Sequence, residues 1–408
     1  MPAPLPRRAF LARTAALAGA SLATTSRTRA AAASTATDDA VGRHKSELPT
    51  PALLVDLDTL DANIAKMAAH CRAAGCAHRP HAKTHKCPEI ARRQIAAGAS
   101  GVCCATVGEA EAMVAAGVRG VLLTSPIFDP RKFARMAALV GRAPDTLLSL
   151  GHALAAERLS AEAKRRGVTV DVLIDLDVGD HRTGITPGEP ALALARAIAR
   201  LPGLRLRGLQ AYSGAASHTA GFEKRRAFSR AALAPAVETR ALLRRAGFDA
   251  PLLSGGSTGT YNIDPGEGGL TELQVGSYVF MDVNYRVIGG QADALYADFA
   301  PSLSVLATVV NTSPAKPEQV VIDAGTKAFS SDSQDKPESK DGRALTYRRF
   351  GDEFGALTAA PGAALPKIGD RLEFLVPHCD PTVNLYDRLH AMRGDKVEAV
   401  WPIMARRG

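Results

Sequence analysis

The pattern in this sequence with the clearest chemical meaning is a lysine placed between two histidines. The segment Arg79–Lys86 reads RPHAKTHK, so Lys83 lies two residues from both His81 and His85. A lysine becomes a nucleophile for imine chemistry when its surroundings lower its pKa and release the neutral amine. Neighbouring cations at Arg79 and Lys86, together with burial in a barrel interior, would both lower it. Composition alone favours a basic surface loop, so the interpretation depends on the rest of the chain.

A second polar segment has the composition of a phosphate-binding loop. Residues 254–260 read SGGSTGT and end a strand-like run that begins at Pro251. Small residues leave backbone N–H groups and hydroxyls free to bind a phosphate. An isolated loop of this composition would more often be a plain turn. Together with Lys83, however, it indicates pyridoxal phosphate, which needs an amine at one end and a phosphate site at the other.

An arginine follows another strand-like run. Residues 177–184 read DVGDHRTG and come directly after the largely apolar run 172–176. Arg182 could pair with the pyridine nitrogen of the cofactor and keep that nitrogen unprotonated. The alternative is a surface ion pair with Asp177 or Asp180.

The motif His378-Cys379-Asp380 is a candidate metal site. It is expected to close a strand, in which residues i and i+2 share a face, so that His378 and Asp380 point the same way. An imidazole and a carboxylate suit a divalent ion such as Mn, Mg, Co or Zn, with coordination positions left open for water or substrate. The alternative is a capping aspartate beside a hydrogen-bonded core histidine.

The helices and strands that must position these residues are predicted to form an α/β barrel. From about residue 48 the chain alternates strand-like runs, beginning with 52–57, and amphipathic helical runs. About eight such units over residues 48–285 predict a (β/α)8 TIM-like barrel. Catalytic groups in such barrels lie at the C-terminal ends of strands, and the polar segments described above fall at those ends.

The chain changes character after Tyr285. Strand-like runs at 302–311, 319–324, 371–377 and 396–402, with few helices, predict a small C-terminal β domain over residues 286–408 that carries the metal site. The polar segment 330–342 is expected to be a long hairpin loop or a mobile flap.

The first residues resemble an export signal. Arg7 and Arg8 precede an Ala/Leu-rich stretch, which predicts a twin-arginine signal over residues 1–33, a linker over 34–47 and a periplasmic location. The alternative is a disordered Ala-rich tail. The apolar stretch is short and interrupted by Gly19 and Ser21, so a stable membrane span is not expected. The twin-arginine route exports folded proteins, which suits an enzyme that acquires its cofactor beforehand.

Overall composition excludes several other classes of protein. The formal charge is +9, but five arginines and no acidic residue lie in residues 1–33, which leaves +4 for the remainder. Aromatic residues make up only 5%, and no basic helix with interleaved stacking residues is present, so nucleic-acid binding is not expected. Six cysteines without paired CxxC motifs argue against a structural zinc site or a disulfide framework.

These motifs, in this order, resemble the D-threonine aldolase / D-serine dehydratase family. RPHAKTHK, DVGDHRTG and SGGSTGT are joined by QVGSY at 274–278 and PHCDPTVN at 377–384. The family consists of fold-type III pyridoxal phosphate enzymes with an alanine-racemase-like barrel and a C-terminal β domain. The resemblance covers residues from about 48 to 403.

The resemblance implies a role for each motif. Lys83 would bind pyridoxal phosphate covalently and Arg182 would face the ring nitrogen. His378 and Asp380 match the metal pair of the family, and a homodimer is expected. The remaining cofactor-binding residues are those of the phosphate loop and the pocket wall: Gly255, Gly256, Ser257, Thr258, Gln210, Tyr212 and Tyr278.

The resemblance also implies an activity on small molecules. The expected reaction cleaves a D-3-hydroxy amino acid to glycine and an aldehyde, with His81, His85 or a metal-bound hydroxide as the base. The near alternatives are a 3-hydroxyaspartate-specific aldolase and a D-serine or D-3-hydroxyaspartate dehydratase, and the dehydratase would use the same residues. Dehydratases resemble His-x-Cys at the metal motif and aldolases His-x-Asp, so this sequence favours the aldolase. A non-catalytic pyridoxal phosphate carrier and a racemase are the more distant alternatives.

Overall fold

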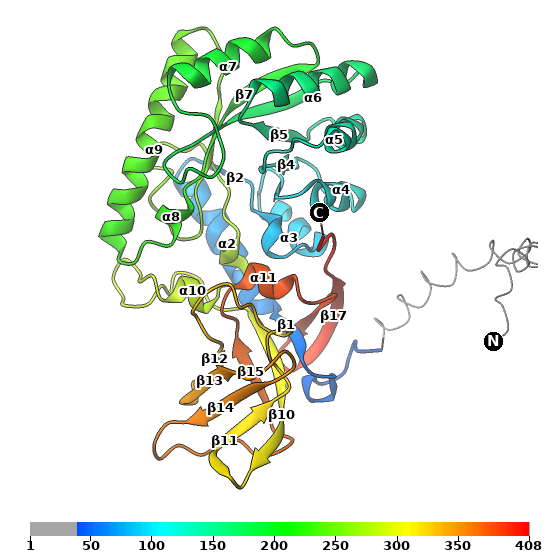
Figure 1. Cartoon of the computed structure of the whole chain (residues 1–408), viewed down its shortest axis with the longest axis vertical. Coiled ribbons are helices and arrows are strands. Elements are labelled where there is room, and N and C mark those ends of the chain that lie inside the picture. The colour runs from blue at the N-terminus through cyan, green and yellow to red at the C-terminus, as the bar shows by residue number, and fades with distance from the viewer. Residues whose placement is uncertain (1–38, 408) are drawn as a thin grey trace, which may run out of the picture.

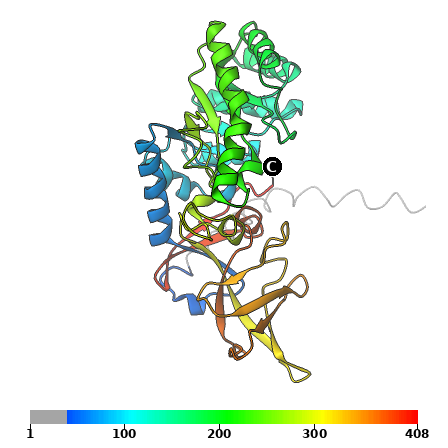
Figure 2. The same ribbon diagram turned by 90° about the vertical axis from the view of Figure 1, so that its left-hand side faces the viewer.

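The computed structural model describes residues 39–407 as an α/β part and a β part stacked along the long axis of the molecule (Figures 1 and 2). The predicted signal at 1–33 and the first residues of the predicted linker lie outside this range. Within the described range, no helix combines the length and the apolar character needed to cross a membrane.

The α/β part contains the predicted barrel. Its eight parallel strands are joined in the order β2-β9-β8-β7-β6-β5-β4-β3. A parallel bridge between His81 and Cys103 connects the two ends of this order, so the segment that carries Lys83 also closes the curled sheet. The strands are β2 (Ala77–His78), β3 (Cys103–Cys104), β4 (Leu122–Leu123), β5 (Leu147–Leu150), β6 (Val170–Leu176), β7 (Leu204–Ala211), β8 (Leu252–Gly255) and β9 (Glu272–Leu273).

Helices surround this sheet, and the sequence explains where several of them begin. Asp56 accepts a hydrogen bond from Thr59 N–H at the start of α2, and Thr106 caps α4 in the same way. Every residue of β6 is buried, as expected for a parallel strand covered on both faces. The helices are α2 (Leu57–Ala73), α3 (Pro88–Ala96), α4 (Val107–Ala115), α5 (Pro130–Arg142), α6 (Ala153–Arg166), α7 (Glu189–Ala199), α8 (Gly214–Ser217) and α9 (Phe222–Arg245).

The β part confirms the predicted C-terminal domain. The predicted strands at 302–311, 319–324, 371–377 and 396–402 correspond to β10, β11, β15 and β17. The second sheet pairs its strands in the order β13-β14-β11-β10-β1-β16-β17, with β15 and β12 on a branch from β10. Its strands after residue 300 are β10 (Leu303–Ser313), β11 (Lys316–Ile322), β12 (Glu338–Ser339), β13 (Leu345–Arg349), β14 (Gly355–Ala359), β15 (Arg371–Leu375), β16 (Arg388–Arg393) and β17 (Lys396–Pro402).

The expectation that the strand at 52–57 begins the barrel is wrong. This strand, β1 (Ala52–Asp56), lies in the second sheet, antiparallel to β10 and parallel to β16. The sequence analysis missed two barrel strands, β2 and β9, which have only two residues each. An apolar run predicts a strand but not the sheet it joins. The predicted boundary at residue 48 therefore assigned β1 to the wrong domain.

Short helical segments bring the two parts together where the barrel strands end. The segment η2 (Ala82–Thr84), which contains Lys83, packs against α11 (Cys379–Val383) of the β part. The predicted flap at 330–342 contains β12 and is tied to α10 (Val283–Arg286) by contacts of Asn284 with Asp335 and of Arg286 with Glu338. These contacts bring Asp380 of the β part next to Lys83 at the ends of the barrel strands.

Candidate active site

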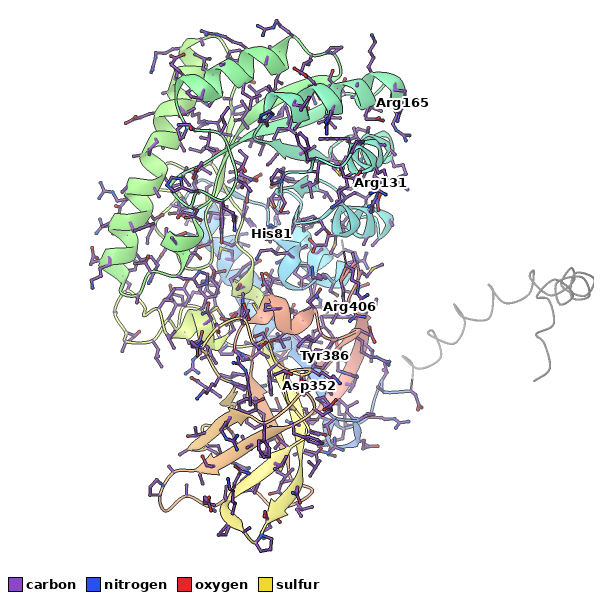
Figure 3. All side chains as sticks on the ribbon, in the orientation of Figure 1. His81, Arg131, Arg165, Asp352, Tyr386 and Arg406 are labelled. Carbon is purple, nitrogen blue, oxygen red and sulfur yellow. The ribbon has the colours of Figure 1, made fainter. Side chains whose placement is uncertain are left out.

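A cavity of about 410 Å³ opens at the C-terminal ends of the barrel strands. Its wall combines the Lys83 segment, the ends of β6 and β7, the loop after β8 and the residues around Gly276. Figure 3 shows His81 within the body of the molecule, whereas Arg131 and Arg165 lie on its outer surface. Most residues predicted for the site line this cavity: His81, Lys83, Arg182, Gln210, Tyr212, Ser257 and Thr258.

Lys83 reaches the cavity and forms an ion pair with Asp380. Its side chain is 42% exposed, so the amine is open to a ligand. The negative charge of Asp380, opposed by burial, raises the pKa of Lys83 above its ordinary value. Burial alone would raise the pKa of the Asp380 carboxyl, but the charges of Lys83 and His378 outweigh it and hold that pKa well below its usual range. The two side chains are therefore a charged pair in this structure.

The expectation that neighbouring cations lower the pKa of Lys83 is wrong for this state of the protein. Arg79 is buried and forms a salt bridge of 3.0 Å with Glu272 of β9. Lys86 forms a buried ion pair with Glu109 of α4. Each flanking cation has its own carboxylate, so neither opposes protonation of Lys83 as the sequence suggested. Those two carboxylates lie 193 and 23 positions from their partners in the sequence, outside the motif, which therefore cannot reveal them.

His81 and His85 do not supply a free base to the cavity. The Nδ1 atom of His81 accepts from Lys83 N–H at 3.4 Å, and its Nε2 atom donates to Thr124 Oγ1 at 3.1 Å. His85 lies outside the cavity lining, fully buried, and its Nδ1 atom accepts from Cys87 N–H at 3.0 Å. Burial lowers the pKa of His81 well below its ordinary value and that of His85 to about 4. Both rings are therefore neutral and hold the backbone around Lys83 in place.

The floor of the cavity is a network of buried polar side chains around Gln210. Its Nε2 atom donates to Asp175 Oδ1 at 2.8 Å and to the Thr124 carbonyl oxygen at 2.9 Å. Its Oε1 atom accepts from Ser149 and Gln274. Burial raises the pKa of Asp175, partly opposed by the bond from Gln210. The sequence prediction included Gln210 but did not name Asp175 as a site residue; an acidic residue near the C-terminal end of β6 was the available signal.

Arg182 lies at the mouth of the cavity with its guanidinium 5.2 Å from the centre of the Tyr212 ring. The two aspartates that could have paired with it at the surface have other partners. Asp177 accepts from His181 Nδ1 at 2.8 Å, and Asp180 accepts from Ser213 and from Gly214 N–H. Arg182 is thus held by an aromatic face.

The prediction that Tyr278 lines the cofactor pocket is not supported. Its ring is fully buried against Phe299, and its hydroxyl accepts from Gln94 Nε2 at 3.0 Å, away from the cavity lining. Its backbone N–H does reach the site, because it donates to Thr258 Oγ1 at 3.0 Å. The tyrosine that lines the cavity is Tyr285, which the sequence analysis missed.

The loop after β8 forms a cradle that only glycines allow. A Cβ at Gly255 would lie 1.7 Å from the Ala211 carbonyl oxygen, and one at Gly259 would lie 2.1 Å from that of Ser217. Gly256 has φ +73°, where a side chain is strained. These close approaches bring Ser257 and Thr258 to the cavity wall, while Gly255 and Gly256 lie behind it.

The prediction that His378 and Asp380 end a strand is wrong. Strand β15 ends at Leu375, His378 precedes α11, and Asp380 lies in its first turn. Nδ1 of His378 contacts Asp332 Oδ2 at 2.6 Å, which leaves Nε2 available to a ligand, as in many carboxylate–histidine–metal arrangements. Among the described residues, no cluster of three or more His, Cys, Asp or Glu side chains is arranged to hold a metal ion. The pair therefore fits an open two-ligand site only when Asp380 is released from Lys83.

The residues of the cavity fit pyridoxal phosphate. An accessible amine at Lys83 and the cradle at Ser257 and Thr258 line the same space. The backbone N–H groups of Thr258 and Gly259 donate to no group within the described part of the chain, as expected of donors reserved for an anion.

Comparison with known families agrees with this arrangement. Residues 55–284 match the model of "Alanine racemase, N-terminal domain", which is more than half of the chain. Residues 302–392 match the model of "Putative serine dehydratase domain". The two matches correspond to the barrel with its cavity and to the β part that carries His378 and Asp380.

The chain is similar over nearly its whole length to characterised lyases. It is 39% identical to D-threonine aldolase of Arthrobacter sp., covering 88% of this chain and 93% of the relative. It is 37% identical to 3-hydroxy-D-aspartate aldolase of Paracoccus denitrificans (strain Pd 1222), covering 90% and 94%. It is 32% identical to D-threo-3-hydroxyaspartate dehydratase of Delftia sp. (strain HT23), covering 87% and 97%.

The fold agrees with the sequence comparison. The crystal structure of D-threonine aldolase from Filomicrobium marinum superposes with a TM-score of 0.85 at 36% identity and covers 90% of this chain and 98% of that one. The chain therefore belongs to the D-threonine aldolase / D-serine dehydratase family of fold-type III pyridoxal phosphate lyases.

Proposed function

We propose that this protein is a pyridoxal phosphate- and divalent-metal-dependent aldolase that cleaves D-3-hydroxy amino acids of the D-threonine type to glycine and an aldehyde. One observation supports the proposal: Lys83, which lines the cavity, forms an ion pair with Asp380, so that the His-x-Asp pair lies next to the imine-forming lysine. The lysine exchanges with the substrate amine, and the amino and 3-hydroxyl groups of the substrate are on adjacent carbons. A site that engages the 3-hydroxyl must therefore lie close to Lys83.

The chain's own residues have distinct tasks in such a reaction. Bound pyridoxal phosphate supplies the electron sink that makes cleavage of the Cα–Cβ bond accessible. Ser257 and Thr258 bind the phosphate, and Arg182 pairs with the pyridine nitrogen. Engagement of the Lys83 amine removes the partner of Asp380 and frees that carboxylate for a metal ion.

The 3-hydroxyl needs a site that lowers its pKa, and the His378–Asp380 pair is the best placed. A divalent ion held there would supply Lewis-acid chemistry. Asp332 contacts Nδ1 of His378, which leaves Nε2 available to bind the ion. His81 has both ring nitrogens committed, and His85 is fully buried with its Nδ1 atom accepting from Cys87 N–H. Removal of the hydroxyl proton therefore depends on the His378–Asp380 pair.

The residue two positions after His378 favours the aldolase over the dehydratase. Solved variants of the D-threo-3-hydroxyaspartate dehydratase replace a histidine and a cysteine two positions apart, the cysteine variant in a metal-free form. This chain has the same spacing with Asp380 at the second position, and the Cys379 thiol is fully buried. A racemase would need a tyrosine base, but the Tyr285 hydroxyl is bonded to Ser217 at 2.9 Å, and burial raises its pKa well above the ordinary value.

Product analysis with and without metal tests this proposal. Purified protein loaded with pyridoxal phosphate receives D-threonine or D-serine in manganese or in chelator. Metal-dependent glycine and acetaldehyde support the aldolase, and keto acid with ammonia from either substrate would refute it. Lys83→Ala should remove both the visible absorbance of the bound cofactor and the activity, whereas Lys327→Ala, on an exposed ion pair with Glu353, should retain both.

We also propose export by the twin-arginine route to the periplasm, and assembly as a homodimer. The pair Arg7-Arg8 and the apolar stretch after it support export. Replacement of both arginines by lysine should retain the protein in the cytosol, and unchanged export would refute this route. Sedimentation of the purified protein as a monomer would refute the dimer.

A further inference from the structure

A buried carboxylate lies directly behind the phosphate cradle. Asp264 is 1% exposed, and its two oxygens accept from two hydroxyls: Oδ1 from Ser229 of α9 at 2.5 Å and Oδ2 from Thr260 at 2.5 Å. A Cβ at Gly256 would lie 2.9 Å from Oδ2, so the cradle backbone rests against this carboxylate. An ionised carboxylate at this position would repel a phosphate dianion bound in the cradle.

Hydrogen bonds connect Asp264 to the cavity through Thr260 and Ser257. Thr260 Oγ1 accepts from Ser257 N–H at 3.2 Å and lies 3.2 Å from Ser257 Oγ, and either hydroxyl can be the donor in the second contact. Ser257 lines the cavity. The chain Asp264–Thr260–Ser257 therefore runs from the buried carboxylate to the phosphate site.

The direction of this chain follows from the protonation of Asp264, because each hydroxyl has one hydrogen and two lone pairs. An ionised Asp264 only accepts, so Thr260 must donate to it, and a hydrogen bond between the Ser257 and Thr260 hydroxyls then requires Ser257 to be the donor. The Ser257 hydroxyl then offers only lone pairs to a phosphate. A protonated Asp264 reverses the order: Asp264 donates to Thr260, Thr260 donates to Ser257, and the Ser257 hydrogen is free to point at the ligand.

Charged groups around Asp264 do not fix it in the ionised form. Burial, partly opposed by the Ser229 and Thr260 hydroxyls, raises the pKa of Asp264 to about 6. Arg225, one turn before Ser229, donates only to backbone carbonyls, including that of Gly259. Other charged or titratable groups on the neighbouring segments have partners of their own: Arg226 and Arg230 pair with Glu267, and Tyr261 pairs with Asp298.

We propose that Asp264 is a protonation-dependent positioning residue for the cofactor phosphate: phosphate binding is coupled to uptake of one proton by Asp264, which turns the Ser257 hydroxyl into a donor to the ligand. The inference rests on the proposed function, because it takes the loop at 254–260 as the phosphate site. No bond other than O–H is made or broken, and solvent supplies the proton. Cofactor affinity should therefore fall as pH rises above the pKa of Asp264.

Binding of pyridoxal phosphate and of pyridoxal to the metal-free apoprotein tests the coupling. Pyridoxal can engage Lys83 but has no phosphate, so the ratio of the two dissociation constants isolates the phosphate contribution from the titration of Lys83. In the wild type, pyridoxal phosphate should bind more tightly than pyridoxal. The ratio of their affinities should fall by up to about tenfold per pH unit between about pH 6 and pH 8. Calorimetry in buffers of different ionisation enthalpy should show matching proton uptake, specific to pyridoxal phosphate.

The variant Asp264→Asn is the decisive comparison. Its amide oxygen can accept from Ser229 and its NH2 group can donate to Thr260, which fixes the chain in the donating direction without a proton. Apart from any proton taken up by the ligand itself, the proton uptake that is specific to pyridoxal phosphate should disappear in this variant. Its affinity for pyridoxal phosphate at about pH 8 should equal or exceed that of the wild type. Glu267→Gln, which removes a surface carboxylate three residues away, should behave like the wild type.

Other outcomes separate the inference from the proposed function. If Asp264→Asn takes up protons as the wild type does, or binds the cofactor more weakly than the wild type at every pH, the coupling is wrong although the phosphate site stands. If pyridoxal phosphate binds no better than pyridoxal to the wild type, the loop is not a phosphate site and both fail. Should Asp264→Asn not fold, Thr260→Val interrupts the same chain and must also abolish the phosphate-specific uptake.

Discussion

At the scale of single residues, Lys83 and Asp380 set each other's protonation. The sequence motif alone indicated a lysine activated by flanking cations, but Arg79 and Lys86 are neutralised by Glu272 and Glu109. The charge that acts on Lys83 comes from Asp380, almost three hundred positions away in the sequence. A resting lysine that is protonated and paired is protected from adventitious aldehydes, and it must lose a proton when the cofactor binds.

Replacement of Asp380 by asparagine should make Lys83 more reactive in the apoprotein. The Asp380 charge raises the pKa of Lys83, so removing that charge lowers this pKa and increases the neutral amine at any given pH. The midpoint of pyridoxal phosphate imine formation against pH should move to lower pH by about one unit or more. Absorbance titration of the metal-free apoprotein measures it.

Asp332→Asn is the matched control for that titration. It removes a carboxylate that contacts His378 and is 45% exposed, so the midpoint for Lys83 should change little. An unchanged midpoint in Asp380→Asn would contradict the ion pair as the origin of the raised pKa.

At the scale of elements, the cradle after β8 depends on the absence of side chains. Gly259→Ala would place a Cβ 2.1 Å from the Ser217 carbonyl oxygen and force the loop away from α8. We expect affinity for pyridoxal phosphate to fall by about tenfold or more, the equivalent of at least about 1.4 kcal/mol, with a smaller effect on pyridoxal. Equilibrium titration of the apoprotein with each ligand provides the measurement.

A glycine in the same segment provides the control for steric effects. A Cβ at Gly266 would have no atom within 4 Å, so Gly266→Ala should bind both ligands normally. Equal effects of the two substitutions would show that the loop tolerates displacement and that close approach is not what holds the cradle.

The sequence predicted the helices and strands better than the tertiary contacts between them. The strand–helix alternation and the loop at 254–260 gave the barrel and most of the cavity wall, because both depend on local pattern. The motif around His378 was predicted as a strand, since three residues do not reveal that a helix begins at Cys379. Tyr278 and Tyr285 lie seven positions apart, and only tertiary packing decides which of them faces the cavity. Asp264 and Asp175 were not predicted as site residues, because a single acidic residue does not form a recognisable motif.

At the scale of the whole molecule, β1 joins the two parts. It lies between β10 and β16, with Leu54 opposite Ser304 on one side and His390 on the other, and then leads directly into α2 of the barrel. The first strand after the linker is therefore a central strand of the C-terminal sheet. Local pattern could not reveal this pairing, because its partners lie about 250 and 335 residues further along the chain.

A fragment containing residues 286–408 alone should not fold. It lacks β1, whose Leu53, Leu54 and Val55 are buried, each worth about 1.5 to 3 kcal/mol, and it leaves the edges of β10 and β16 unpaired. Circular dichroism on heating should show no cooperative transition, in contrast to residues 39–408. A cooperative transition in the shorter fragment would show that β1 is dispensable for the second sheet.

The central claim is that Lys83 and the His378–Asp380 pair act together to break the Cα–Cβ bond, and reaction in D2O tests it most directly. D-threonine is incubated with the manganese-loaded holoenzyme, and products and remaining substrate are followed by proton NMR. We predict glycine with one deuteron at Cα and acetaldehyde, while unreacted D-threonine retains its Cα hydrogen. Loss of that hydrogen from the remaining substrate, or a keto acid as the product, would show that the enzyme removes the Cα proton and would contradict the account.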